Sequence, residues 1–94
     1  MSLTRNIAET IALRSLAWLV GNEDLLPVFL GSSGMSEGDL RASAQEPEFL
    51  GSLLDFILTD DAWVIACCDA QNLPYEQLAQ ARHSLPGGEQ IHWT

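Results

Sequence analysis

Pro47-Glu48-Phe49-Leu50-Gly51-Ser52-Leu53-Leu54-Asp55-Phe56-Ile57-Leu58 is the stretch that decides the fold class of this chain. Its large apolar side chains recur with the 3.6-residue period of an α-helix and fill one broad arc. The other arc holds the polar and small residues, Glu48, Gly51, Ser52 and Asp55. Pro47 suits the first helical turn, where a missing N–H is tolerated. The pattern predicts an amphipathic helix over residues 47–58 whose apolar arc faces a core.

Two helices are expected before this stretch. The first covers residues 4–20 and is apolar around most of its second half, so we expect it at the centre of the fold. Two adjacent sides of it are apolar: Ile7, Ile11 and Trp18, and then Ala8, Ala12, Leu16 and Leu19. Gly21-Asn22 is a typical helix stop. A short second helix is predicted from about residue 23 or 24 to Leu30, with Gly31-Ser32-Ser33-Gly34 ending it.

Three further helices are marked by their ends. Ser36-Glu37-Gly38-Asp39 is a close variant of the capping box and opens a helix that ends near Gln45. Thr59-Asp60-Asp61 caps another over residues 60–71. Pro74 opens the last one, which runs to about Ser84. Gly34 and Asn72 hold equivalent places before two of these helices, and both are residues that tolerate the left-handed conformation.

These elements predict an all-α protein, a compact single-domain bundle of five or six short helices with short loops. Residues 1–85 form the helical domain, and residues 86–94 form a C-terminal tail. The tail leaves the last helix through Pro86-Gly87-Gly88 and then carries Ile91 and Trp93. Three interpretations stay open for it: a segment packed back on the core, a short linear motif for a partner groove, or a surface for self-association that would make a homodimer instead of a monomer.

The charge of the chain excludes some classes of partner. Thirteen Asp and Glu residues stand against four Arg and no Lys, which gives a net charge of −9. Nucleic acids and anionic membranes bind through clustered cations, so neither is an expected partner. A basic protein partner is favoured instead. The candidate contact surface combines Ile91 and Trp93 with carboxylates of the acidic stretch, namely Glu46, Glu48, Asp55, Asp60 and Asp61. The alternative is that these acids only stabilise helix starts.

No catalytic, cofactor-binding or metal-binding residue is predicted. Cys67 and Cys68 are adjacent, so they cannot crosslink distant parts of the chain, and their apolar surroundings indicate small buried side chains in a reducing compartment. His83 and His92 lack the spacing of metal ligands. Gly31-Ser32-Ser33-Gly34 is neither a nucleophile elbow nor a phosphate loop. We therefore expect a non-enzymatic cytoplasmic protein without a cofactor, and no stretch is apolar for long enough to span a membrane.

Three classes of function remain open. The first is a small protein-interaction module or adaptor. The second is a nucleic-acid-associated regulator, in which a helix-turn-helix-like corner at Asn72 would present residues 75–84, with Gln77, Gln80, Arg82 and His83 outward. Only Arg82 of that set could hold a phosphate firmly. The third is a small-ligand binder or small enzyme, which would need a pocket with a perturbed titratable group.

The chain also resembles a known family. The segments that carry the resemblance are spread over nearly its whole length: Ala17-Trp18-Leu19, Phe29-Leu30, Gly34-Met35-Ser36, Asp39-Leu40-Arg41, Pro47-Glu48-Phe49-Leu50, Leu53-Leu54-Asp55-Phe56, Asn72-Leu73-Pro74, Ala81-Arg82 and Leu85-Pro86-Gly87-Gly88. They are similar to a family of short uncharacterised alphaproteobacterial proteins, a domain of unknown function. The resemblance implies a small bacterial cytoplasmic protein. It implies no activity and transfers no functional residue.

Overall fold

The computed structural model describes residues 4–86, which form six helices and no strand. This confirms the predicted all-α bundle. The helices are α1 (Arg5–Val20), α2 (Leu26–Ser33), α3 (Glu37–Ser43), α4 (Pro47–Leu58), α5 (Asp61–Gln71) and α6 (Tyr75–His83). None of them is both long and apolar enough to cross a membrane.

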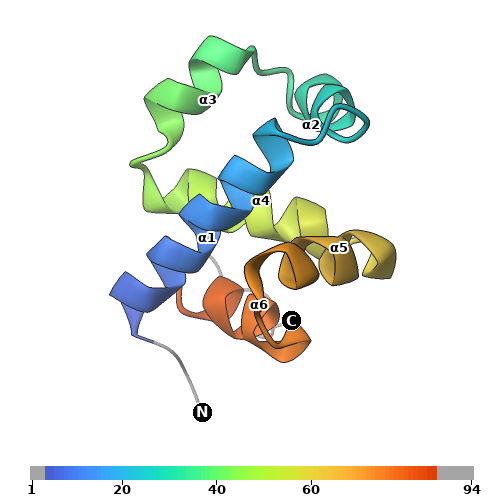
Figure 1. Cartoon of the computed structure of the whole chain (residues 1–94). Coiled ribbons are helices and arrows are strands. Elements are labelled where there is room, and N and C mark those ends of the chain that lie inside the picture. Colours follow the sequence, from blue (N-terminus) through green and yellow to red (C-terminus); the bar gives the residue numbers. More distant parts are fainter. Residues whose placement is uncertain (1–3, 87–94) are drawn as a thin grey trace, which may run out of the picture.

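α1 is the central element, as its apolar circumference predicts. It runs diagonally across the molecule in front of α4, with α5 and α6 below and to the side (Figure 1). α1, α4, α5 and α6 all pack against one another. α2 and α3 sit at the top of the view and make fewer contacts with the rest. The fold is therefore a four-helix core with a two-helix extension at one end.

Local signals position the helix ends as the sequence predicts. Ser36 and Asp39 form a complete capping box, in which each side chain accepts from the backbone N–H of the other residue. Asp60 caps α5 by accepting from the N–H of Ala62 at 2.8 Å. Gly34 and Asn72 end α2 and α5 with positive φ angles of 75° and 56°. Each of these signals acts within four residues, which is why sequence alone reveals them.

The prediction for the second helix is wrong at both ends. It starts at Leu26 and continues through Gly31, Ser32 and Ser33 to the cap at Gly34. The side chain of Asn22 accepts from the N–H groups of Asp24 and Leu25, and this turn delays the helix start. A Gly-Ser segment weakens a helix without forbidding it, so the only residue here that must leave the helical conformation is Gly34.

The core lies where α1, α4 and α6 meet. Its fully buried side chains include Leu19, Leu53, Leu54, Ile57 and Leu78. Gly51 departs from the prediction, since it falls in the polar arc of α4 but is buried. Its neighbours are the side chain of Arg82 and the backbone of Pro86. The polar arc of α4 is thus partly covered by the end of α6, which the periodicity of α4 alone could not indicate.

Candidate functional site

The five described carboxylates of the predicted contact surface occupy different environments. Glu46 and Glu48 are exposed at the start of α4, and Asp61 is exposed at the start of α5. Asp60 is the cap of α5, and Asp55 is engaged in an ion pair. Two of the five therefore have structural partners, and the sequence interpretation that acids stabilise helix starts is correct for Asp60. The predicted tail residues Ile91 and Trp93 lie outside the described residues.

Asp55 forms an ion pair with Arg82, the last arginine of the chain. The Nε of Arg82 donates to Asp55 Oδ1 at 2.6 Å, and Arg82 Nη1 donates to the carbonyl oxygen of Pro86 at 2.9 Å. Arg82 is only 8 % exposed, whereas the Asp55 side chain is 48 % exposed. The expectation that Arg82 is presented outward on the last helix is wrong, because the guanidinium is turned inward toward α4. Its donors hold the polypeptide leaving α6 against α4.

An aromatic groove lies between α2 and α4. We define the aromatic groove by Phe29, Ser32, Ser33 and Met35 on one side and Phe49, Ser52, Asp55, Phe56 and Thr59 on the other, and its volume is about 520 Å³. Phe29 meets Phe56 edge-on at a centroid distance of 4.9 Å. Phe56 in turn stacks on Trp63 at 4.9 Å. These contacts hold the phenyl rings in fixed positions, so the groove is a formed apolar surface with a hydroxyl-rich edge.

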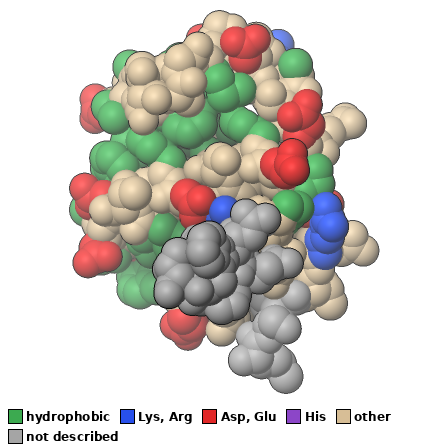
Figure 2. Space-filling view, turned by 180° about the vertical axis from the view of Figure 1, so that it is seen from behind, with side chains coloured by type: hydrophobic (Ala, Val, Ile, Leu, Met, Phe, Trp, Pro, Cys, Tyr) green, Lys and Arg blue, Asp and Glu red, His purple; other side chains and the backbone are tan. Residues whose placement is uncertain are grey.

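Acidic side chains lie around the hydrophobic side chains on one face of the molecule. On the face shown in Figure 2, hydrophobic side chains gather in the upper half and acidic side chains lie around them. Glu48 lies one helical turn before Ser52, a residue of the aromatic groove, and Asp55 is itself a lining residue. Because Asp55 is paired with Arg82, Glu48 is, among residues 4–86, the free carboxylate beside this apolar groove, and it is suited to a positive charge on an apolar ligand.

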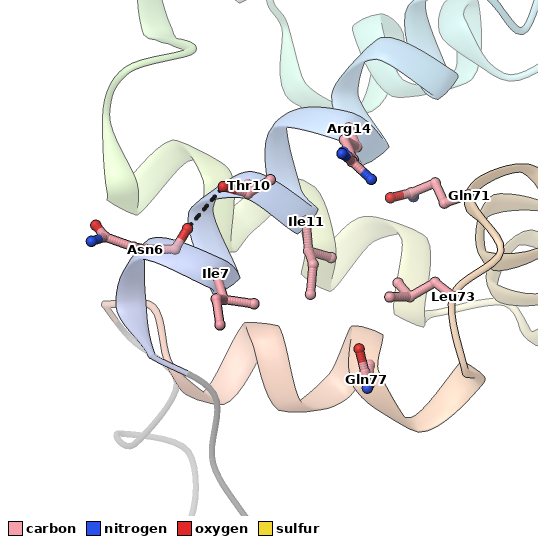
Figure 3. A pocket seen from close by; sticks show the side chains of 8 residues that line it. All are labelled: Asn6, Ile7, Thr10, Ile11, Arg14, Gln71, Leu73 and Gln77. Atoms are coloured by element: carbon pink, nitrogen blue, oxygen red, sulfur yellow. Dashed lines mark hydrogen bonds between the residues drawn. The ribbon is translucent and has the colours of Figure 1, made fainter.

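A second groove, the Arg14 groove, lies between α1 and α6 and has a volume of about 340 Å³ (Figure 3). Its apolar lining is Ile7, Ile11 and Leu73, and its polar lining is Asn6, Thr10, Arg14, Gln71 and Gln77. Among residues 4–86, no carboxylate lines it. Ile7 is 49 % exposed, so the apolar side of α1 predicted from sequence is only partly covered. Arg14 makes no ion pair with any residue of the described range 4–86.

A buried hydrogen-bond network supports the Arg14 groove from behind. Ser15 is fully buried and donates to the Ile11 carbonyl at 2.8 Å. Gln71 Nε2 donates to Ser15 Oγ at 3.1 Å and also lies within hydrogen-bond distance of the Cys67 carbonyl and thiol. The amide nitrogen of Gln71 is therefore fixed, and its oxygen is directed toward Arg14 across the groove (Figure 3).

Both cysteines are buried and unpaired, as predicted. Burial raises the pKa of the Cys67 thiol. Burial, with repulsion from Cys67 and Asp69, raises the pKa of the Cys68 thiol to about 11. A thiol with a raised pKa is a poor nucleophile because the reactive species is the thiolate. Cys67 and Cys68 thus act as small core side chains.

The described part of the chain offers no further site of a recognisable chemistry. Within residues 4–86, no three His, Cys, Asp or Glu side chains lie close enough together to hold a metal ion. Among the surface pockets of this region, the aromatic groove and the Arg14 groove differ in character. The fold and these grooves define a small all-α protein with apolar surface grooves.

The comparison with known proteins identifies the family. A family described as "Protein of unknown function (DUF3572)" matches residues 5–88, and the chain belongs to it. This confirms the resemblance drawn from the sequence segments. No curated protein and no solved structure matches the chain.

Sequence reasoning missed both grooves. Phe29, Phe49 and Phe56 were expected on apolar helix faces, and nothing local indicates that all three border one groove. Arg14 appeared only as one of four scattered arginines. A usable signal was present for Arg14, because it follows Ile7 and Ile11 at helical spacing and so extends an apolar stripe with a charge.

Proposed function

We propose that this protein is a non-catalytic cytoplasmic protein-interaction module, and that its aromatic groove binds an amphipathic helix with apolar and basic side chains. The observation that carries the proposal is the set of packed phenyl rings between α2 and α4, in which buried Phe29 holds the partly exposed Phe49 and Phe56. A few well-packed anchor residues at the centre of an interface dominate its binding energy, and aromatic side chains are suited to this role.

The shape and lining of the aromatic groove favour an amphipathic helix as the partner. It is open along its length and lies between two helices, the geometry in which a third helix places an apolar face. Phe49 and Phe56 lie two turns apart on α4, a spacing that matches apolar anchors two turns apart on a partner helix. The hydroxyls of Ser32, Ser33 and Ser52 offer hydrogen bonds at the edge.

The basic character of the partner follows from charge. The chain has a net charge of −9, and the exposed Glu48 lies one helical turn before Ser52, a lining residue of the groove. Opposite charge on the partner would accelerate association and select against acidic competitors. Such binding weakens as salt screens the charges, and its apolar part persists.

The test uses the whole chain and two model peptides. One is a fluorescein-labelled amphipathic helix of Leu and Lys, and the other has the same composition in a scrambled order that abolishes the apolar face. We expect saturable binding of the amphipathic peptide by fluorescence anisotropy and at least tenfold weaker binding of the scrambled one. Equal binding of the two would reduce the interaction to nonspecific charge attraction and overturn the proposal.

Two matched variants locate the binding surface. Ser52→Trp fills the aromatic groove, and Thr10→Trp fills the Arg14 groove. Both residues are exposed helical hydroxyls that donate to the carbonyl four residues earlier. We expect Ser52→Trp to weaken amphipathic-peptide binding at least tenfold and Thr10→Trp to leave it within twofold. If sedimentation instead showed a dimer that Ser52→Trp dissociates, the occupant would be a second copy of this chain, and the proposal of a separate partner would fail.

A further inference from the structure

We infer that the Arg14 groove binds the C-terminal residue of a peptide chain, with the terminal carboxylate on Arg14, the last backbone N–H on Gln71 and an apolar last side chain on Ile11 and Leu73. This site is separate from the aromatic groove and does not depend on the function proposed for it. Three features of the groove carry the inference.

The first feature is an isolated cation. Arg14 extends into the groove from α1, and none of the Asp and Glu residues in the described range 4–86 lines the groove. Arg5 and Arg82 are paired with Glu9 and Asp55, whereas Arg14, like Arg41 on α3, has no ion-pair partner among residues 4–86. A guanidinium binds a carboxylate through two parallel hydrogen bonds, so Arg14 is suited to an anion with two oxygens.

The second feature is a fixed acceptor beside the cation. Gln71 Nε2 is held by Ser15 Oγ at 3.1 Å, which leaves the amide oxygen facing the groove (Figure 3). That oxygen cannot receive a hydrogen bond from a carboxylate. It requires an N–H or O–H donor next to the anion. A C-terminal residue has this arrangement, because its carboxylate and its amide N–H are attached to the same Cα.

The third feature is the apolar lining next to these polar groups. Ile11 and Leu73 extend into the space between α1 and α6, and Ile7 is half-exposed beside them (Figure 3). At about 340 Å³ the groove is in the size range of small-ligand sites. An apolar last side chain fits this lining, whereas a polar one would leave the half-exposed Ile7 and the partly exposed Leu73 in contact with water.

The test is a titration followed by protein NMR. The probe is acetyl-Ala-Ala-Leu with a free carboxylate, compared with the same peptide as a C-terminal amide. We expect saturable shifts of Ile7, Ile11 and Leu73 at millimolar free-acid peptide, the range for a small ligand, and at least fivefold weaker binding of the amide. A third ligand, 4-methylpentanoate, keeps the carboxylate and side chain but lacks the N–H, and we expect it to bind more weakly than the free acid.

Arg14→Gln and Arg41→Gln form the matched pair of variants. Both arginines are exposed on helices, and each change removes one positive charge. We expect Arg14→Gln to make the acid and amide peptides bind equally and Arg41→Gln to preserve their difference. Absence of saturable shifts, or an acid preference that survives Arg14→Gln, would overturn the inference. Binding of N-acetyl-leucine without binding of the tripeptide would replace the peptide terminus by a small N-acyl amino acid and would equally overturn it.

Discussion

The guanidinium of Arg82 occupies the space that a side chain at Gly51 would need. A Cβ at Gly51 would lie 2.6 Å from Arg82 Nη1 and 3.1 Å from the carbonyl oxygen of Pro86. Glycine at this position lets α6 and the residues after it approach α4 closely enough for Arg82 to reach Asp55. The relationship joins residues 31 positions apart, and no pattern within α4 reveals it.

Gly51→Ala is therefore expected to destabilise the protein although alanine favours a helix. Moving Arg82 away breaks hydrogen bonds of a buried guanidinium, and we expect the free energy of unfolding to fall by about 1–2 kcal/mol. In an Arg82→Ala background the obstruction is gone, and Gly51→Ala should become neutral or stabilising by up to about 1 kcal/mol. Urea unfolding of the four proteins measures this cycle. An equal loss in both backgrounds would instead identify the Pro86 carbonyl as the obstacle.

Asp60→Ala is expected to lower the free energy of unfolding by about 1 kcal/mol, because it removes the cap bond to the N–H of Ala62. Asp61→Ala is the matched control. It removes the same charge from the next position of the same helix start, where only the interaction with the helix dipole is lost, about 0.3–0.5 kcal/mol. Thermal or urea unfolding compares them. Equal losses of stability in the two variants would mean that the negative charge stabilises this helix start and that the hydrogen bond from Ala62 does not.

Asn72→Ala is expected to lower the free energy of unfolding by about 1 kcal/mol, and Asn72→Gly is expected to leave it nearly unchanged. Asn72 ends α5 with φ at 56°, a conformation that a Cβ-bearing residue adopts at a penalty and glycine adopts freely. Unfolding of the two variants by urea provides the comparison. A larger loss with glycine than with alanine would show that the side chain of asparagine, and not the backbone conformation, is what matters.

Stability is expected to fall as the pH rises from about 9 toward 11. The folded-state pKa of Cys68 is raised to about 11 from an ordinary value of 9.0, so the fold favours the neutral thiol. Below pH 9 the Cys68 thiol is protonated in both the folded and the unfolded protein, and its contribution to stability is fully present. Above it the unfolded thiol ionises first, and a loss on the order of 2 kcal/mol develops by pH 11. The measurement is the free energy of unfolding of the native protein and of Cys68→Ala as a function of pH. Identical pH dependence of the two proteins between pH 9 and 11 would contradict the prediction.

The helix ends were the most predictable part of the structure. Ser36 with Asp39, Asp60 with Ala62 and the left-handed residue Asn72 all act over four residues or fewer, so the sequence displays both partners at once. The extent of α2 was predicted wrongly at both ends: the Asn22 turn delays its start, and Gly31-Ser32-Ser33 disfavours a helix only slightly at its end. A weak local preference is easily overridden by the contacts of neighbouring residues.

The candidate sites were much less predictable. The acidic stretch was recognised as a unit, but Asp55 and Asp60 turn out to bond to Arg82 and to the start of α5. Arg82 appeared to be an outward cation of the last helix and is buried against α4. In each case the missing information is the identity of the partner, which lies on another helix or depends on where the helix starts.

The sequence by itself determined that this chain is helical, where most of its helices begin and end, and that it carries a net charge of −9. Those properties depend on periodicity, capping and composition, all of which act locally or as sums. Only the tertiary structure decided that Gly51 faces Arg82, that Phe29 meets Phe56, and that Arg14 shares a groove with Gln71. These pairings arise from how the helices cross, and helix crossing is set by the simultaneous packing of side chains distant in sequence.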